Sequence, residues 1–174
     1  MKGLAIRERY ERTCESYDEL YRGEQYEKYF IALKAVKPRG IVLDAGCGTA
    51  LLAEFLKAWG VLDGLDLYVC LDYSGCMLEI AEWKLRNICG GNCITILGDV
   101  ENLPFKKGVF DVTYAFTVID LLDDPLRGLE EMLRVTRGEV VVSTLKRLPY
   151  KDMLLNMEFK VIGESSKDLI FKVK

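Results

Sequence analysis

Residues 42–50 constrain the fold of this chain more than any other segment, because they predict a strand, a tight turn and the start of a helix in direct succession. They read V-L-D-A-G-C-G-T-A, so an apolar run ends in the carboxylate of Asp44 and two glycines follow it. Glycine permits a positive φ and a close approach of a ligand to the backbone. The first turn of a helix also has amide donors that the helix leaves free. The segment therefore predicts a ligand site at the carboxyl end of a parallel strand.

The charge of Asp44 indicates which ligand this turn would accept. The dinucleotide fingerprint requires glycine or alanine where this chain has Leu51, so that pattern fails. A carboxylate two residues before Gly46 repels a pyrophosphate, and a partly buried cleft screens the repulsion poorly. The same carboxylate attracts a cation. A generic strand–turn–helix and a divergent dinucleotide site are the alternatives for this segment.

The sequence D-A-G-C-G-T resembles motif I of the class I S-adenosylmethionine-dependent methyltransferases, whose cofactor carries an ammonium and a sulfonium and has no phosphate. The resemblance extends over essentially the whole chain. It implies a methyltransferase that uses S-adenosylmethionine and releases S-adenosylhomocysteine. The scarcity of glutamine and asparagine beside 51 charged residues is typical of a small thermophilic or archaeal member. Motif I implies cofactor contacts from five residues of the turn: Asp44, Ala45, Gly46, Cys47 and Gly48.

Length and apolar patterning narrow the class of protein. A chain of 174 residues is one domain by default. No apolar stretch approaches the roughly 18 residues of a membrane span, and the first residues lack the apolar core of a signal peptide. We therefore expect a cytoplasmic protein with no membrane partner.

The content of cysteine and histidine excludes several kinds of site. Histidine is absent, and no two of the six cysteines form a C-x-x-C pair. Zinc sites rely on such clusters, and Cys–His or Ser–His–Asp catalysis needs an imidazole. We therefore expect no metal. The cysteines are predicted to be separate thiols, with a local bridge between Cys89 and Cys93 as the alternative.

The net charge of −3 is distributed unevenly along the chain. Residues 41–133 carry fifteen acidic and six basic side chains, whereas residues 134–174 carry five acidic and nine basic ones. The acidic middle segment contains the predicted cofactor site and suits a cationic cofactor. The basic last segment suits an anionic acceptor such as RNA, with an ordinary solvated surface as the alternative.

Strand and helix patterns alternate after residue 40. Helical spacing of apolar residues follows the first, second, fourth and fifth predicted strands. Residues 159–163 and 169–173 are joined by a tight turn, as in an antiparallel hairpin. The alternation predicts a parallel sheet with helices on both faces. The five earlier strands are expected at residues 41–44, 67–71, 93–97, 109–116 and 139–145.

Together with the resemblance, this pattern implies a three-layer αβα Rossmann-like methyltransferase fold. Its mostly parallel seven-stranded sheet has the order 3-2-1-4-5-7-6, and the last strand is antiparallel. Residues 1–174 form a single domain, with an N-terminal helical cap over residues 1–38 and a cofactor-binding core over residues 39–174. In the cap, spacing predicts one helix over residues 8–21 and a second from Tyr26, separated at Gly23.

Residues after the second, third and fourth strands are further candidates, because ligands of open α/β sheets bind at the carboxyl ends of strands. Asp72 can accept both ribose hydroxyls, with an ordinary acid at a helix N-terminus as the alternative. The resemblance implies that Tyr73 packs on adenine, that Asp99 accepts from the adenine amino group, and that the amide of Val100 donates to the ring. It also implies that Phe116 borders the methionine moiety.

Methyl transfer is an in-line displacement, so positioning of the acceptor can supply roughly 7–11 kcal/mol of the barrier, and a general base is optional. Asp120 is the first candidate base because it lies just past the fourth strand, and Glu101 and Tyr114 are the others. A helix-capping or solvent-facing role is an equal alternative for Asp120. Many relatives have histidine at that position, so its absence here excludes a histidine proton shuttle.

The acceptor is constrained less than the cofactor. The fourth strand ends in A-F-T-V rather than N-P-P-Y or D-P-P-Y, which disfavours adenine N6 and glutamine amide nitrogens as acceptors. The segment between the fifth strand and the hairpin is too short for a lid. We therefore expect a large acceptor, namely RNA or a protein of the translation apparatus. A small-molecule acceptor is one alternative, and a non-catalytic scaffold subunit is another. A small activating protein partner is a further expectation.

Two groups of side chains are expected beside the cleft. The first is predicted to form a partial lid, with plain core packing as the alternative: Tyr10, Tyr17 and Tyr21. The second is predicted to hold phosphates at the mouth of the cleft, with loop solubility as the alternative: Lys146, Arg147 and Lys151.

Overall fold

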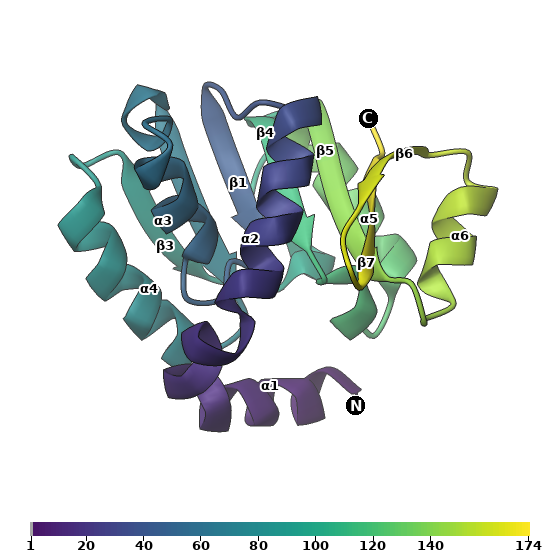
Figure 1. Ribbon diagram of the computed structural model, residues 1–174, viewed down its shortest axis with the longest axis horizontal. Coiled ribbons are helices and arrows are strands. Elements are labelled where there is room, and N and C mark those ends of the chain that lie inside the picture. The colour runs from purple at the N-terminus through teal and green to yellow at the C-terminus, as the bar shows by residue number, and fades with distance from the viewer. Residues whose placement is uncertain (1) are drawn as a thin grey trace.

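A computed structural model describes residues 2–174, with side chains from residue 8 onward. Met1, the first residue of the predicted cap, lies outside the described residues. The strands form one seven-stranded sheet in the order β3-β2-β1-β4-β5-β7-β6 (Figure 1). They are β1 (Ile41–Ala45), β2 (Leu67–Asp72), β3 (Cys93–Leu97), β4 (Phe110–Phe116), β5 (Thr136–Leu145), β6 (Lys160–Glu164) and β7 (Asp168–Lys172).

The pairing of the strands confirms the predicted topology. β1 pairs in parallel with β2 and with β4, and β7 is antiparallel to both β5 and β6. Both faces of the central strands are buried, because successive apolar side chains point to opposite faces and each face is covered by helices. The helices are α1 (Lys2–Thr13), α2 (Tyr17–Ala35), α3 (Leu51–Ala58), α4 (Gly75–Ile88), α5 (Pro125–Val135) and α6 (Tyr150–Asn156), with short 3-10 turns η1 (Cys14–Ser16), η2 (Leu62–Gly64), η3 (Val100–Asn102) and η4 (Ile119–Leu121).

Two apolar clusters make the three layers. On one face, side chains of α2, α3 and α4 such as Tyr29, Leu52 and Leu78 pack on the sheet. On the other face, α5 and α6 contribute Met132 and Leu154. The sheet is therefore held from both sides, as the predicted αβα fold requires.

Within the described part of the chain, every helix is too short or too polar to cross a bilayer.

The N-terminal helices differ from the expectation. Gly23 does not separate two helices but lies inside α2, and the chain instead bends at the 3-10 turn η1. A helical glycine is tolerated where neighbouring turns are well held. Here Arg22 bonds Asp18 and Tyr26 four residues away on either side, so the helix continues past the glycine. β5 also begins earlier than predicted, at Thr136, directly after α5.

α1 lies across the carboxyl ends of the parallel strands, at the bottom of the view in Figure 1. The Glu11 carboxylate accepts hydrogen bonds from the Ser74 hydroxyl and from the Gly75 amide, at 3.1 and 2.8 Å. An acid at the N-terminus of α4 also complements the helix dipole. This contact and a disulfide described below hold the N-terminal segment over the edge of the sheet where ligands are expected.

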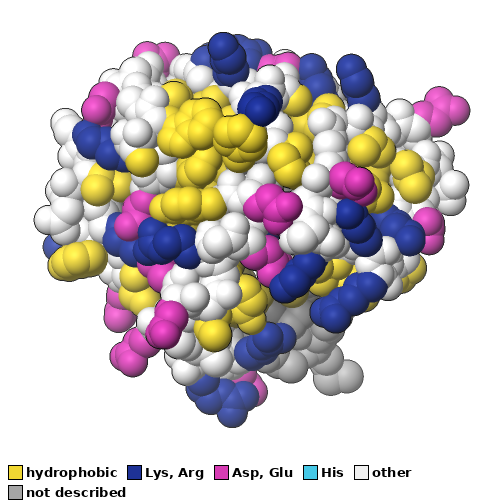
Figure 2. Space-filling model, in the orientation of Figure 1, with side chains coloured by type: hydrophobic (Ala, Val, Ile, Leu, Met, Phe, Trp, Pro, Cys, Tyr) yellow, Lys and Arg dark blue, Asp and Glu magenta, His cyan; other side chains and the backbone are white. Residues whose placement is uncertain are grey.

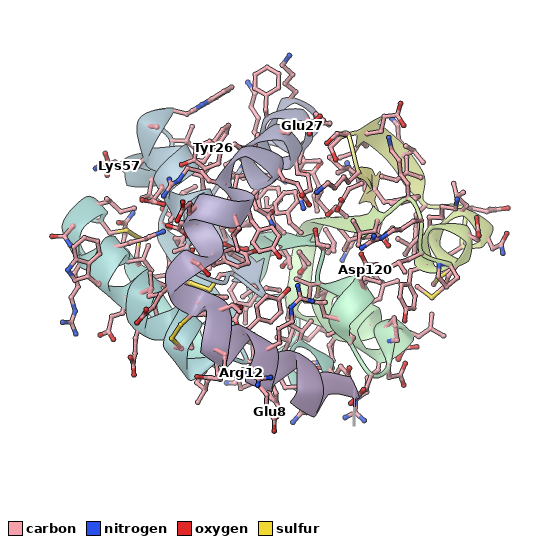
Figure 3. The ribbon with its side chains drawn as sticks, turned by 60° about the horizontal axis from the view of Figure 1, so that its bottom comes forward. Glu8, Arg12, Tyr26, Glu27, Lys57 and Asp120 are labelled. Carbon is pink, nitrogen blue, oxygen red and sulfur yellow. A yellow bond between two sulfur atoms is a disulfide. The ribbon has the colours of Figure 1, made fainter. Side chains whose placement is uncertain are left out.

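All six cysteines are paired, so the prediction of separate thiols is wrong. Only the local Cys89–Cys93 pair was an alternative in the sequence. The other pairs join residues 62 and 23 positions apart, which only the folded chain brings together. Figure 3 shows the sulfur–sulfur bonds in yellow. The two long-range pairs are Cys14–Cys76 and Cys47–Cys70.

Reduction is expected to lower the free energy of unfolding by about 2–4 kcal/mol for the Cys14–Cys76 bridge, because that bridge closes a long loop in the unfolded chain. Urea denaturation with and without a thiol reductant measures the loss. The double variant Cys89→Ser with Cys93→Ser is the matched control. It removes only the local bridge, which closes a short loop, so its free energy of unfolding should fall by less than that of the reduced protein. Six alkylatable thiols in the native oxidised protein would contradict the pairing.

Candidate functional site

The turn after β1 has the backbone that its glycines allow. Gly46 and Gly48 have φ values of +74° and +55°, in the left-handed region that favours glycine. A Cβ on Gly46 would lie 2.4 Å from a methyl carbon of Val118, so no larger residue fits at that position. The turn therefore passes close beside the segment that follows β4.

The amides of this turn are already used inside the protein. Those of Gly46 and Cys47 donate to the carbonyl of Leu71, at 2.7 and 3.0 Å. The amide of Gly48 donates to Asp72 Oδ2 at 2.8 Å. A phosphate bound to such a turn would need these amide donors unoccupied, so the turn is not organised as a phosphate site.

A cavity of about 160 Å³ opens beside the turn, and we call it the acidic cavity. Among the residues whose side chains the structure describes, four carboxylates line it and no lysine or arginine does. Such a lining attracts a cation and repels a phosphate. It contains five residues predicted for the cofactor site: Gly46, Asp72, Tyr73, Asp99 and Val100. Its other lining residues were not predicted to contact the cofactor: Glu101, Val118, Leu121, Leu122 and Asp123.

Asp72 joins the turn to the end of β2. Its Oδ2 accepts from the Gly48 amide and its Oδ1 from the Ser74 amide at 2.9 Å. Burial raises the pKa of Asp72, and these amide hydrogen bonds oppose that rise. The cap of α4 is Ser74, whose side chain accepts from the Met77 amide. Ser74 rather than Asp72 therefore caps α4, and the Asp72 carboxylate keeps further lone pairs that face the cavity.

The lining of the acidic cavity does not include four residues of the turn predicted to contact the cofactor: Asp44, Ala45, Cys47 and Gly48. Ala45 is fully buried in β1, and the side chain of Cys47 is bonded to Cys70. Asp44 is 4% exposed, accepts a hydrogen bond from the Tyr68 hydroxyl, and lines neither the acidic cavity nor the tyrosine cavity described below. Burial raises the pKa of Asp44 to about 7.

Asp44 should make the stability of the ligand-free protein fall with pH. Because its folded pKa of about 7 exceeds its ordinary value of 3.8, the folded state holds the proton more tightly than the unfolded state. The stabilisation is full below the ordinary pKa and is lost as the pH rises through the folded pKa, by about 4 kcal/mol at most. Urea denaturation between the pH values of these two pKa values measures the effect. The free energy of unfolding of Asp44→Asn should fall less steeply with pH than that of the unaltered protein. Asp66→Asn, at the exposed opposite end of β2, is the control, and an unchanged slope in Asp44→Asn would contradict the prediction.

A second cavity, of about 300 Å³, adjoins the acidic cavity at Leu121. We call it the tyrosine cavity, because Tyr10, Tyr17 and Tyr21 of the N-terminal segment line it. The tyrosines therefore lie where the predicted lid would be. The cavity also contains Phe116 and further residues: Arg9, Glu24, Gln25, Thr117, Asp120, Leu145, Arg147, Leu148 and Lys167.

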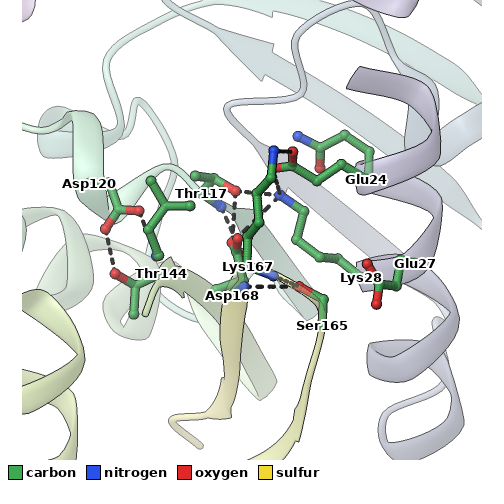
Figure 4. A network of polar contacts seen from close by, with 12 residues as sticks. Glu24, Glu27, Lys28, Thr117, Asp120, Thr144, Ser165, Lys167 and Asp168 are labelled. Carbon is green, nitrogen blue, oxygen red and sulfur yellow. Dashed lines mark hydrogen bonds and ion pairs between the residues drawn. The ribbon is translucent and has the colours of Figure 1, made fainter. Parts of the chain in front are cut away.

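Asp120 is the one candidate base in the tyrosine cavity. It is 5% exposed, and its two carboxylate oxygens accept from the Thr144 hydroxyl and from the Leu145 amide (Figures 3 and 4). These bonds hold the end of β5. Glu101 lies on the acidic cavity and accepts from the amides of residues 123 and 124. Tyr114 is fully buried under α2 with its hydroxyl on a backbone carbonyl, so its geometry excludes it as a base.

A buried ion pair, which the sequence did not predict, lies under the tyrosine cavity. Lys28 and Asp168 are both 0% exposed, with Nζ and Oδ2 3.5 Å apart. Lys28 donates to Thr117 Oγ1 at 2.6 Å, and Thr117 and Ser143 both donate to Asp168 (Figure 4). The network fixes Thr117, whose φ is +61°, directly after Phe116. A lysine on a helix gives no sequence signal for burial, because most such lysines are solvated.

Comparisons with known proteins agree with this geometry. A family model described as a methyltransferase domain matches residues 43–152. The malonyl-[acyl-carrier protein] O-methyltransferase of Yersinia pestis is 28% identical over 81% of this chain and 50% of its own length. The demethylmenaquinone methyltransferase of Symbiobacterium thermophilum is 31% identical over 76% and 55%. The chain thus spans about half the length of these curated relatives.

A solved structure has the same fold over nearly the whole chain. The S-adenosylmethionine-dependent methyltransferase of Aquifex aeolicus superposes with a TM-score of 0.74 at 19% identity, covering 93% of this chain and 96% of that one. The family match confirms the predicted resemblance, and with it S-adenosylmethionine as the cofactor. This chain belongs to the methyltransferase-domain family of class I S-adenosylmethionine-dependent methyltransferases.

Proposed function

We propose that this chain transfers the methyl group of S-adenosylmethionine to a small-molecule acceptor held in the tyrosine cavity. One observation carries the proposal: an acid-lined cavity with no lysine or arginine among its described lining residues meets a second cavity at Leu121, beside the end of β4. The first suits a ligand with two positive charges and no phosphate. Asp72 would hold the ribose, Tyr73 the adenine face, and Asp99 with the Val100 amide the adenine edge.

The cofactor supplies an electrophilic methyl carbon, to which an acceptor lone pair bonds while the electron pair of the C–S bond leaves with sulfur. Phe116 and Thr117 would border the reacting atoms, since both line the tyrosine cavity at the end of β4. The network around Lys28 keeps this segment in place. A proton lost by a hydroxyl acceptor would pass to Asp120 and then to water. Positioning of this kind can supply roughly 7–11 kcal/mol of the barrier.

The size of the tyrosine cavity supports a small acceptor. A volume of about 300 Å³ is within the range typical of sites for small molecules. The two curated relatives are named for a quinone and for an acyl-carrier substrate. The RNA or protein acceptor that we expected from the sequence stays a prediction, as do the small activating partner and the cytoplasmic location.

Two measurements test the proposal. Calorimetry should detect binding of S-adenosylmethionine and no binding of NAD. Incubation with methyl-labelled cofactor and fractionated cell extract should then place the label in small molecules, and Asp72→Ala is the matched control that should transfer none. Binding of NAD alone would overturn the cofactor assignment. Label only in RNA or protein would overturn the small acceptor and support the expectation from the sequence.

Asp120→Asn is expected to lower turnover by about 100-fold or more while leaving cofactor affinity unchanged, because general bases contribute on this scale and Asp120 lies in the tyrosine cavity alone. Thr144→Val removes a donor to Asp120 and should reduce turnover much less. Equal losses in the two variants would mean that Asp120 acts by holding β5. Unchanged turnover at every pH would remove Asp120 from the reaction.

A further inference from the structure

The charge around the tyrosine cavity is opposite in sign to that of the acidic cavity. Arg9, Arg147 and Lys167 line the tyrosine cavity, whereas every charged side chain that the structure describes in the lining of the acidic cavity is a carboxylate. Of its two acids, Glu24 pairs with Lys167 at 2.6 Å and so neutralises that cation, and Asp120 accepts hydrogen bonds from the end of β5. Three cations against two acids leave one positive charge in excess among the described lining residues.

Arg147 is the cation best placed to meet a ligand. It is exposed, and it makes no hydrogen bond or ion pair with any side chain that the structure describes. It also lines an adjoining hollow together with Lys146 and Lys167. In Figure 2, basic side chains gather at the lower right, where Figure 1 places the end of β5 and the β6–β7 turn. The tyrosine cavity thus opens onto a basic mouth.

Gln25 gives an independent indication of a ligand. It is 6% exposed and lines the tyrosine cavity, and its Nε2 donates to the Tyr17 hydroxyl at 3.1 Å. Its Oε1 is buried and has no hydrogen-bond partner among the residues that the structure describes. Buried acceptors are nearly always satisfied, so an unpartnered carbonyl in a cavity wall points to a donor that a ligand brings. A hydroxyl or amine of the ligand would supply that donor.

We propose that the tyrosine cavity takes a small organic anion, with its carboxylate or phosphate at Arg147 and its hydroxyl or amine donating to Gln25 Oε1. This rests on the proposed function, in which the occupant of the cavity is the methyl acceptor. Arg147 selects the charge by a charge-assisted hydrogen bond. Gln25 is a positioning residue that turns the polar end of the acceptor inward, and the tyrosines contact its apolar body.

Binding of four probes to the protein with saturating S-adenosylhomocysteine tests this proposal. The probes are 4-hydroxybenzoate, 4-hydroxyphenyl phosphate, neutral 4-hydroxybenzamide and benzoate, which lacks the hydroxyl. Calorimetry should show one or both hydroxylated anions binding at least tenfold more tightly than the amide, and their order distinguishes carboxylate from phosphate. Benzoate should bind more weakly than 4-hydroxybenzoate.

Variants assign these differences to residues. Arg147→Gln should weaken binding of the anions by tenfold or more and leave binding of the amide unchanged. Gln25→Met should weaken binding of the hydroxylated probes and leave binding of benzoate unchanged. Lys160→Gln, an exposed basic residue of β6, is the charge-matched control. Affinity for S-adenosylhomocysteine should be the same in all variants, which shows that each one folds.

Equal affinity for the amide and the anions, or no detectable binding of any anion, would overturn the proposal. Tighter, Arg147-dependent binding of a single-stranded RNA oligonucleotide would overturn it in favour of a nucleic acid. These outcomes are distinct from failure of the proposed function. That failure would appear as a loss of cofactor binding or of methyl transfer by the unaltered protein.

Discussion

Lys28→Met is expected to lower the free energy of unfolding by about 3–5 kcal/mol. The substitution leaves Asp168 fully buried without the cation that pairs with it, Lys28. One carboxylate oxygen of Asp168 already lacks a hydrogen-bond partner in the described part of the chain, so the charge would be poorly compensated. Urea denaturation measures the loss. Lys34→Met, on the exposed face of the same helix, is the control and should cost less than about 1 kcal/mol.

A double-mutant cycle shows whether the loss comes from the unpaired charge. Adding Asp168→Asn to Lys28→Met removes both charges and keeps an oxygen for Thr117 and Ser143. The double variant should recover a large part of the stability lost in Lys28→Met alone, since neighbours in one network are strongly coupled. The buried pair would be contradicted by a loss below about 1 kcal/mol in Lys28→Met. It would also be contradicted if the loss in the double variant equalled the sum of the losses in Lys28→Met and Asp168→Asn.

Asp72→Ala is expected to weaken S-adenosylmethionine binding by at least about 100-fold. The substitution removes a carboxylate from the acidic cavity and also the acceptor of the Gly48 and Ser74 amides. Hydrogen bonds to charged groups contribute about 1.5–3 kcal/mol each, so two of them to a ribose account for this factor or more. Calorimetry measures the affinity.

Asp66→Ala is the matched control for Asp72→Ala. Asp66 precedes β2 and is exposed, so it lies at the opposite end of the same strand. Its loss should leave cofactor affinity unchanged. Asp72→Asn keeps the size of the side chain, and a weakening close to that of alanine would show that charge matters more than shape. Affinity within about threefold of the unaltered protein in Asp72→Ala would contradict the assignment.

The parts of the site that could be predicted depend on chain order and strand polarity alone. Asp72, Tyr73, Asp99 and Val100 follow the ends of two parallel strands, and parallel strands end at the same edge of a sheet. Gly46 follows a third strand, and its positive φ is what its residue type permits. Local pattern and a right-handed parallel topology therefore suffice to gather these residues.

The distribution of charge along the sequence indicated the charge of the cofactor, but it did not indicate where each acidic side chain lies in the fold. The acidic middle segment predicted a cationic cofactor, and the acidic cavity is lined from that segment. Asp44, however, does not line the cavity and is buried under the hydroxyl of Tyr68. Its burial depends on the packing of β2 against β1, which the motif itself does not contain.

The sequence alone determined the fold, the family resemblance and the edge of the sheet at which the cofactor is expected. Each of these follows from short-range pattern and the order of elements. Only the tertiary structure decided the rest: the pairing of Cys14 with Cys76, the burial of Lys28 against Asp168, and the unpartnered carbonyl of Gln25. These depend on contacts between residues that are far apart in the chain or on the shape of a cavity. No local pattern encodes them, because the same cysteine, lysine or glutamine would satisfy the helix equally well facing solvent.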